Sequence, residues 1–115
     1  WDSTGLCLFT SFAWSLENVA PHMDSACEGD WDADRLMETG ERIWNLERDF
    51  NMRAGLTAAD DTLPKRLLEE AANTGPAEGK VSGLAEMLPE YYKERGWRQD
   101  GNLSDETRER LRLPG

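Results

Sequence analysis

The sequence predicts an all-α fold, with several short helices arranged irregularly behind an N-terminal loop. Two observations predict it. No stretch alternates apolar and polar residues for long, and the β-branched aliphatic residues that favour strands are sparse, with one Ile and two Val. In addition, apolar residues recur in seven-residue steps in the middle of the chain, as they do on one face of a helix.

The first fourteen residues have neither the helical nor the strand period. Ser3 to Leu16 contains no charged residue, and Gly5 leaves the backbone free of the Cβ constraint. We expect a loop that leads into a short buried segment. The chain begins at Trp1 with an uncharged run and without an initiator Met, which favours a C-terminal piece of a longer protein.

Two helices are expected next. The first runs from Pro21 to Cys27, because proline suits the first turn of a helix, and it stops at Gly29. The second runs from Asp34 to Met52, with acidic residues at its start and Gly55 after its end. Its apolar stripe contains Leu36, Met37, Ile43, Trp44 and Phe50. Gly40 lies on the same face, where glycine costs about 1 kcal/mol relative to alanine, so we expect another backbone to pack closely there.

Three further helices complete the prediction. A short helix over Lys65–Ala72 is followed by a turn and a surface loop that reaches Ser82. A helix over Leu84–Arg95 faces inward with its leucines and tyrosines and stops at Gly96, and Pro89 should kink it or shift its start. A last helix over Asp105–Leu111 is capped by Ser104.

The composition excludes several classes of partner. Thirteen Lys and Arg stand against 23 Asp and Glu, for a net charge of −10. Such a balance argues against nucleic acid and against an anionic membrane surface. The uncharged stretch is too short to span a bilayer, and no signal peptide is evident. Two cysteines make no disulfide framework, so the expected compartment is the cytoplasm.

Asp2, Gly5 and Cys7 bring a carboxylate, a flexible glycine and a thiol within six residues. A carboxylate can accept two N–H groups from a planar heterocycle, and a thiolate can ligate zinc or an iron–sulfur cluster. The spacing alone favours a plainer role for Cys7 as a small buried hydrophobic residue, because a lone cysteine without a CxxC partner usually has that role.

Five sequence strings resemble one family, the tungsten-dependent aldehyde:ferredoxin oxidoreductases. The strings follow the family's order over essentially the whole chain: residues 2–7 (DSTGLC), 40–55 (GERIWNLERDFNMRAG), 60–66 (DDTLPKR), 86–92 (EMLPEYY) and 95–97 (RGW). The resemblance implies the C-terminal helical domain of such an enzyme, spanning residues 1–115, with a cofactor-binding N-terminal loop.

The resemblance also implies roles for individual residues. Asp2 corresponds to a carboxylate that hydrogen-bonds one of two pterin ligands of the metal, and Cys7 to a thiolate ligand of a [4Fe-4S] cluster. Leu6 and Leu8 would line the same pocket, mostly through their backbone. No residue of this chain is expected to be catalytic itself.

The implied reaction is oxidation of an aldehyde to a carboxylic acid at a tungsten or molybdenum bis-pterin centre, with electrons passing through the cluster to ferredoxin. The other cluster cysteines and the substrate pocket would belong to the rest of the parent enzyme. The resemblance does not decide whether the parent enzyme is a homodimer. We therefore expect these 115 residues alone to be inactive. The alternative is a stand-alone acidic helical interaction module, or a truncated remnant without activity.

The remaining candidates favour structural roles. We expect Cys27 to pack in the core, His22 to be solvated, and Asp60 and Asp61 to form a turn or a helix cap. Arg42, Asn45 and Arg48 share one helix face, where pairing with neighbouring glutamates is the simpler interpretation and buried interface contacts are the other. The five tryptophans are expected to anchor the core or an interface.

Overall fold

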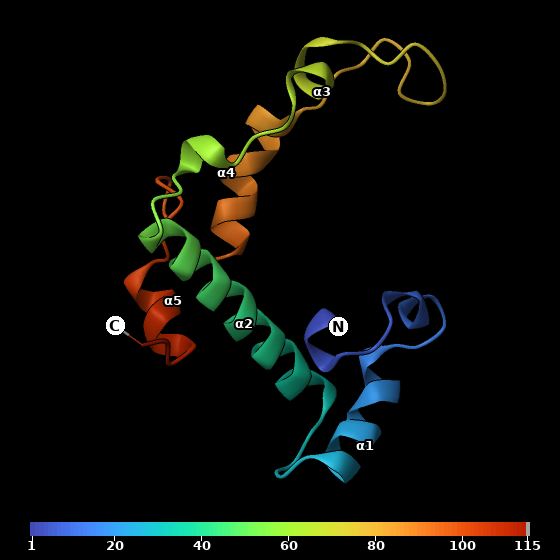
Figure 1. The fold of residues 1–115 in the computed structure, drawn as a ribbon, viewed down its shortest axis with the longest axis vertical. Coiled ribbons are helices and arrows are strands. Elements are labelled where there is room, and N and C mark those ends of the chain that lie inside the picture. The colour runs from blue at the N-terminus through green and yellow to red at the C-terminus, as the bar shows by residue number, and fades with distance from the viewer. Residues whose placement is uncertain (115) are drawn as a thin grey trace. The chain divides into compact units, whose positions relative to one another are not determined.

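The computed structural model describes residues 1–114 and confirms the all-α prediction. Its helices are connected as shown in Figure 1, and within the described residues only two isolated β-bridges occur, Ala72 with Glu78 and Trp97 with Leu103. The α-helices are α1 (Leu16–Ala26), α2 (Ala33–Arg53), α3 (Lys65–Glu69), α4 (Leu84–Glu94) and α5 (Asp105–Arg110). Three short 3₁₀-helices are η1 (Asp2–Thr4), η2 (Leu8–Phe12) and η3 (Ala58–Asp60).

The chain forms two compact units rather than one. The first contains Trp1–Glu47 together with the C-terminal residues from Leu111 on, and the second contains Arg48–Arg110. The core of the first unit is formed by Val19, Ala20 and Leu36, with partly buried residues packed around them. In the second unit Tyr92, Trp97 and Leu103 are buried.

The first α-helix begins five residues earlier than predicted. The Ser15 backbone N–H donates to Asn18 Oδ1 at 2.9 Å, which caps the helix before Leu16. Pro21 therefore lies inside α1 rather than in its first turn. The prediction was wrong because the Ser-x-x-Asn cap outweighs the preference of proline for a helix start. Gly29, with φ of 104°, takes the left-handed conformation beyond the end of the helix.

The long helix α2 is confirmed, and its stripe is confirmed in part. Asp32 caps it, since the Arg35 N–H donates to Asp32 Oδ1 at 2.8 Å. Leu36 is buried, but Met37 and Phe50 are exposed. A Cβ atom added at Gly40 would meet no heavy atom within 4 Å among the described residues, so the expected close approach is absent from this part of the chain.

The later helices follow the prediction closely. Helix α3 is shorter than expected, because Glu70 adopts an extended backbone and Ala72 joins a β-bridge. Helix α4 continues through Pro89 without a shifted start, and Tyr92 on it is 3% exposed. Ser104 caps α5 as predicted, accepting the Thr107 N–H at 3.1 Å. No helix within residues 1–114 is long and apolar enough to cross a bilayer.

Candidate functional site

The N-terminal loop is a tightly hydrogen-bonded turn. The Trp1 carbonyl accepts the Thr4 N–H at 3.1 Å and the Thr4 hydroxyl at 2.7 Å. Gly5 follows in the left-handed region, with φ of 74°, and its N–H donates to the Asp2 carbonyl at 3.1 Å. The glycine predicted to relax the backbone therefore closes η1.

Two apolar side chains fasten this loop to the core of the first unit. Trp1 and Leu6 are partly buried and pack against the cluster of Val19, Ala20 and Leu36. The Leu6 N–H donates to the Thr4 hydroxyl at 3.3 Å. The Leu6 side chain therefore packs toward the core. If Leu6 lines the pocket that the resemblance implies, it does so through its backbone.

Cys7 has an exposed thiol that forms no disulfide, and its backbone is held through its carbonyl oxygen. Its carbonyl accepts the Thr10 N–H at 2.9 Å, the Thr10 hydroxyl at 2.7 Å and the Trp1 indole N–H at 3.4 Å. The interpretation of Cys7 as a buried hydrophobic residue is thus wrong for this structure. Asp2 and Leu8 are exposed as well.

No group of three or more His, Cys, Asp or Glu side chains that could hold a metal exists within residues 1–114. The loop therefore offers one soft sulfur ligand and one carboxylate. A site that needs more ligands would have to take them from another polypeptide segment.

The segment after Cys7 is apolar and exposed. In η2, Leu8, Phe9 and Phe12 are 65%, 76% and 83% exposed, and the two phenylalanine rings lie 5.9 Å apart. The expectation of a short buried segment at this place is wrong within the described residues, because no described element covers these side chains. Trp14, at the end of the segment, stacks on His22 with ring centroids 5.4 Å apart.

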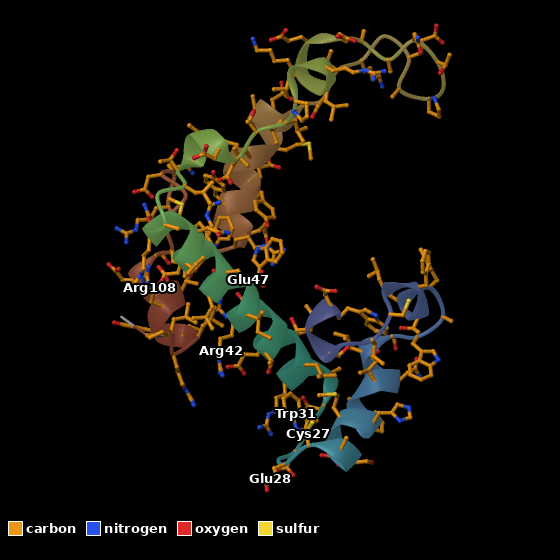
Figure 2. The ribbon with its side chains drawn as sticks, in the orientation of Figure 1. Cys27, Glu28, Trp31, Arg42, Glu47 and Arg108 are labelled. Carbon is orange, nitrogen blue, oxygen red and sulfur yellow. The ribbon has the colours of Figure 1, made fainter. Side chains whose placement is uncertain are left out.

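Cys27 and His22 contribute no site. Cys27 lies in the connection between α1 and α2, where Figure 2 labels it with Glu28 and Trp31. Its side chain is exposed, so its predicted core packing is wrong. That connection is stabilised by Trp31, whose indole N–H donates to the Glu28 carbonyl at 3.2 Å. His22 is exposed, as predicted.

The most highly organised polar cluster lies in the second unit, around Arg48. Its guanidinium donates to both carboxylate oxygens of Asp61, at 2.6 and 2.5 Å, and to the Gly101 carbonyl at 2.9 Å. The guanidinium carbon also lies 4.4 Å from the ring centroid of Trp97. The Tyr92 hydroxyl donates to Asp61 as well. We call these five residues the Arg48 cluster.

Electrostatics within the Arg48 cluster stabilise the ionised carboxylate. The hydrogen bonds from Arg48 lower the pKa of Asp61, and the Tyr92 hydroxyl acts in the same direction against the opposing effect of burial. Burial, followed by the hydrogen bond to Asp61, raises the pKa of Tyr92. The cluster is therefore an ion pair with a neutral tyrosine, which is a structural arrangement rather than an acid–base pair.

The Arg48 cluster brings together four of the five resembling strings. Arg48 belongs to residues 40–55, Asp61 to 60–66, Tyr92 to 86–92 and Trp97 to 95–97. The expectation that Asp60 and Asp61 form a turn or cap holds for Asp60, which accepts the Thr57 N–H at 2.7 Å. It misses Asp61, whose only sequence signal was its place in a resembling string.

The expected pairing with a neighbouring glutamate is confirmed for Arg42, whereas Arg48 pairs with Asp61 and Asn45 bonds a carbonyl of its own helix. Arg42 pairs with Glu38 at 3.7 Å, as the simpler interpretation held, and also donates to the Leu111 carbonyl at 3.1 Å. Asn45 is fully buried, and its side-chain amide donates to the Glu41 carbonyl at 2.9 Å. Nearer the end of the helix, Arg108 of α5 donates to the Asp49 carboxylate.

Comparisons with known proteins agree on one family. The family model described as aldehyde ferredoxin oxidoreductase, domains 2 and 3, matches residues 1–113. The chain is 49% identical over 111 residues to the tungsten-containing aldehyde ferredoxin oxidoreductase of Pyrococcus furiosus, covering 96% of this chain and 18% of that protein. The proteins of the same name from Thermococcus kodakarensis and Pyrococcus abyssi are 48% and 47% identical, over 96% and 97% of this chain and 18% and 19% of theirs.

The chain thus spans less than a fifth of the length of these curated relatives. The match nevertheless extends from the N-terminal loop to the last helix, and it includes the loop with Asp2 and Cys7 and all residues of the Arg48 cluster. The chain belongs to the aldehyde ferredoxin oxidoreductase family.

Proposed function

We propose that this chain is the C-terminal part of a tungsten-dependent oxidoreductase that converts aldehydes to carboxylic acids. In the balanced reaction an aldehyde and one water give a carboxylic acid, two protons and two electrons. A tungsten bis-pterin centre supplies the oxygen-transfer and redox chemistry when it is bound. A [4Fe-4S] cluster, with Cys7 among its ligands, would supply single-electron transfer to ferredoxin, and we propose that the aldehyde pocket belongs to the rest of the polypeptide.

Within that enzyme, Cys7 is proposed to be one of four cluster ligands. The observation that carries this proposal is an exposed thiol on a backbone fixed by three hydrogen bonds to one carbonyl. Iron–sulfur clusters are held by cysteine thiolates, and a rigid attachment limits the movement of the ligand on reduction. One thiol and no neighbouring ligand in the described chain fit a single contribution to a shared site.

Asp2 is proposed to accept N–H groups from a pterin ring. Its carboxylate is exposed at the start of η1, with that short helix held by the Thr4 and Gly5 hydrogen bonds. Cys7 follows Asp2 by five positions along the chain, which limits their Cα separation to about 18 Å even for an extended chain. The two residues that would hold the pterin and the cluster therefore belong to one short loop. Leu6 and Leu8 contribute to the same pocket through their backbone.

The cysteine assignment is tested in the full-length enzyme by comparing Cys7→Ala with Cys27→Ala. Both substitutions remove an exposed thiol of the first unit, but only Cys7 lies in the proposed site. We expect Cys7→Ala to lose the cluster iron and its electron paramagnetic resonance signal, while Cys27→Ala keeps both. An intact cluster in Cys7→Ala would refute the ligand role.

The carboxylate assignment is tested separately with Asp2→Asn. The substitution keeps the shape but replaces one acceptor oxygen by a donor group, so we expect the tungsten and pterin content to fall several-fold while the iron content is retained. Unchanged tungsten content would refute the role of Asp2 and leave that of Cys7 intact.

A further inference from the structure

Two side chains of the N-terminal segment donate hydrogen bonds to the carbonyl oxygen of Cys7. Thr10, three residues later in η2, donates its hydroxyl at 2.7 Å, and its backbone N–H donates to the same oxygen at 2.9 Å. Trp1, six residues earlier, donates its indole N–H at 3.4 Å. A carbonyl oxygen has two lone pairs, so three donors use its whole capacity. The carbonyl is therefore held by groups that precede Cys7 and by groups that follow it.

These bonds determine where the Cys7 side chain begins. Cys7 precedes η2 with φ of −60° and ψ of 130°. When both angles are held, the direction of the Cα–Cβ bond is fixed, and only χ1 remains to place the sulfur in one of three staggered positions. Trp1 also packs against the core of the first unit, so its indole bond ties the Cys7 backbone to that core.

Stability alone does not account for the Thr10 hydroxyl. Its bond to Cys7 is exposed, and so is the equivalent bond of Ser11, whose hydroxyl donates to the Leu8 carbonyl at 2.6 Å. An exposed hydrogen bond replaces one to water and contributes little to the free energy of unfolding. The two hydroxyls thus make the same kind of bond one residue apart, and they differ in the residue that each one holds.

We infer that Thr10 and Trp1 are positioning residues for Cys7, and that their bonds to its carbonyl fix the place at which the sulfur meets a cluster iron. The inference rests on the proposed role of Cys7 and adds two residues that act through it. Groups that orient a metal ligand by hydrogen bonds typically change metal affinity by about 10–100-fold when they are removed.

The test uses the full-length enzyme with Thr10→Val, Thr10→Ser and the control Ser11→Ala. Valine keeps the branched shape of threonine without the hydroxyl, serine restores the hydroxyl, and Ser11→Ala removes the equivalent bond to Leu8. We expect Thr10→Val to release cluster iron to a ferrous chelator at least fivefold faster than the wild type and to broaden the electron paramagnetic resonance signal of the reduced cluster. Thr10→Ser and Ser11→Ala should keep the wild-type rate and signal.

The indole bond is tested with Trp1→Phe, which keeps an aromatic ring for the core and removes the N–H donor. Because this bond is longer than that of Thr10, we expect a smaller effect, an iron release at least twofold faster than in the wild type. A wild-type rate in Trp1→Phe would overturn the role of Trp1.

Equal iron release in Thr10→Val and Ser11→Ala, or no recovery in Thr10→Ser, would overturn the role of Thr10. Either result would assign its hydroxyl to the general stability of η2. These outcomes are distinct from failure of the proposed function, because Cys7→Ala tests the ligand itself. Loss of the cluster in Cys7→Ala together with equal rates in Thr10→Val and Ser11→Ala would leave the proposed function standing without the inference.

Discussion

Arg48 connects segments that lie far apart in the sequence. Its guanidinium contacts Asp61, Gly101 and Trp97, up to 53 residues away. A guanidinium makes two parallel bonds to a carboxylate and stacks on an aromatic face, and lysine can do neither in the same way. The Arg48 cluster therefore depends on the identity of this residue and not only on its charge.

Arg48→Lys should reduce the free energy of unfolding of the chain by about 2 kcal/mol, through loss of the bidentate pair and of the Trp97 stacking. Urea unfolding followed by tryptophan fluorescence measures this change. Arg66→Lys is the control, because its side chain is 84% exposed and its loss should cost less than about 0.5 kcal/mol. Equal effects of both substitutions would contradict the structural role of the cluster.

Asp61 makes the stability depend on pH in a defined direction. Because its pKa is lowered in the folded chain, its contribution is fully present above the pKa of the unfolded state and is lost as the pH falls through the folded pKa. The difference in unfolding free energy between the wild type and Asp61→Asn should thus shrink between about pH 5 and the acid limit of folding. Denaturant titrations at a series of pH values measure it, with the exposed Glu109→Gln as the control. A difference that stays constant with pH would contradict the assignment.

At the scale of the elements, two glycines differ in their surroundings: Gly96 lies in a tight turn, and Gly40 has open space around it. Gly96 has a φ of 68°, and a Cβ atom there would clash with the Thr107 hydroxyl oxygen. Gly96→Ala should therefore destabilise the chain by about 2 kcal/mol. Gly40→Ala, in open space inside α2, should stabilise it by about 0.5–1 kcal/mol. Urea unfolding of both variants checks the two signs, and a loss of stability in Gly40→Ala would contradict the open surroundings.

The sequence predicted the helices well where local signals decide them. Ser104 before α5 and Gly55 after α2 acted as expected. The predicted start of the first helix at Pro21 is wrong, because the cap formed by Ser15 and Asn18 starts α1 at Leu16. Such an error is local, and the Ser-x-x-Asn spacing contained the information needed to avoid it.

The contacts of the Arg48 cluster could not be predicted from the periodicity of the sequence. The hydroxyl of Tyr92 bonds a carboxylate 31 residues away, and no pattern within a helix reports such a partner. The expectation of a buried segment that includes Phe9 and Phe12 was also wrong. An apolar pattern indicates which side chains are favourable to bury, but it does not indicate which part of a protein packs on them. For Asp2 and Cys7 the resemblance, and not the spacing, pointed to a site.

At the scale of the whole molecule, the N-terminal loop offers too few ligands for a complete redox centre. Anaerobic reconstitution of residues 1–115 with iron and sulfide should therefore give no stoichiometric [4Fe-4S] signal, since four thiolates are needed and the sequence contains two cysteines. Iron analysis and electron paramagnetic resonance measure the outcome. A full complement of cluster in this chain alone would contradict a site shared with the rest of the enzyme.

The most direct measurement is a crystal structure of the full-length enzyme with the iron positions located by anomalous scattering. We predict that Cys7 Sγ lies within bonding distance of one cluster iron, and that the other three irons are bound by cysteines from outside these 115 residues. A cluster whose four protein ligands exclude Cys7 would contradict it.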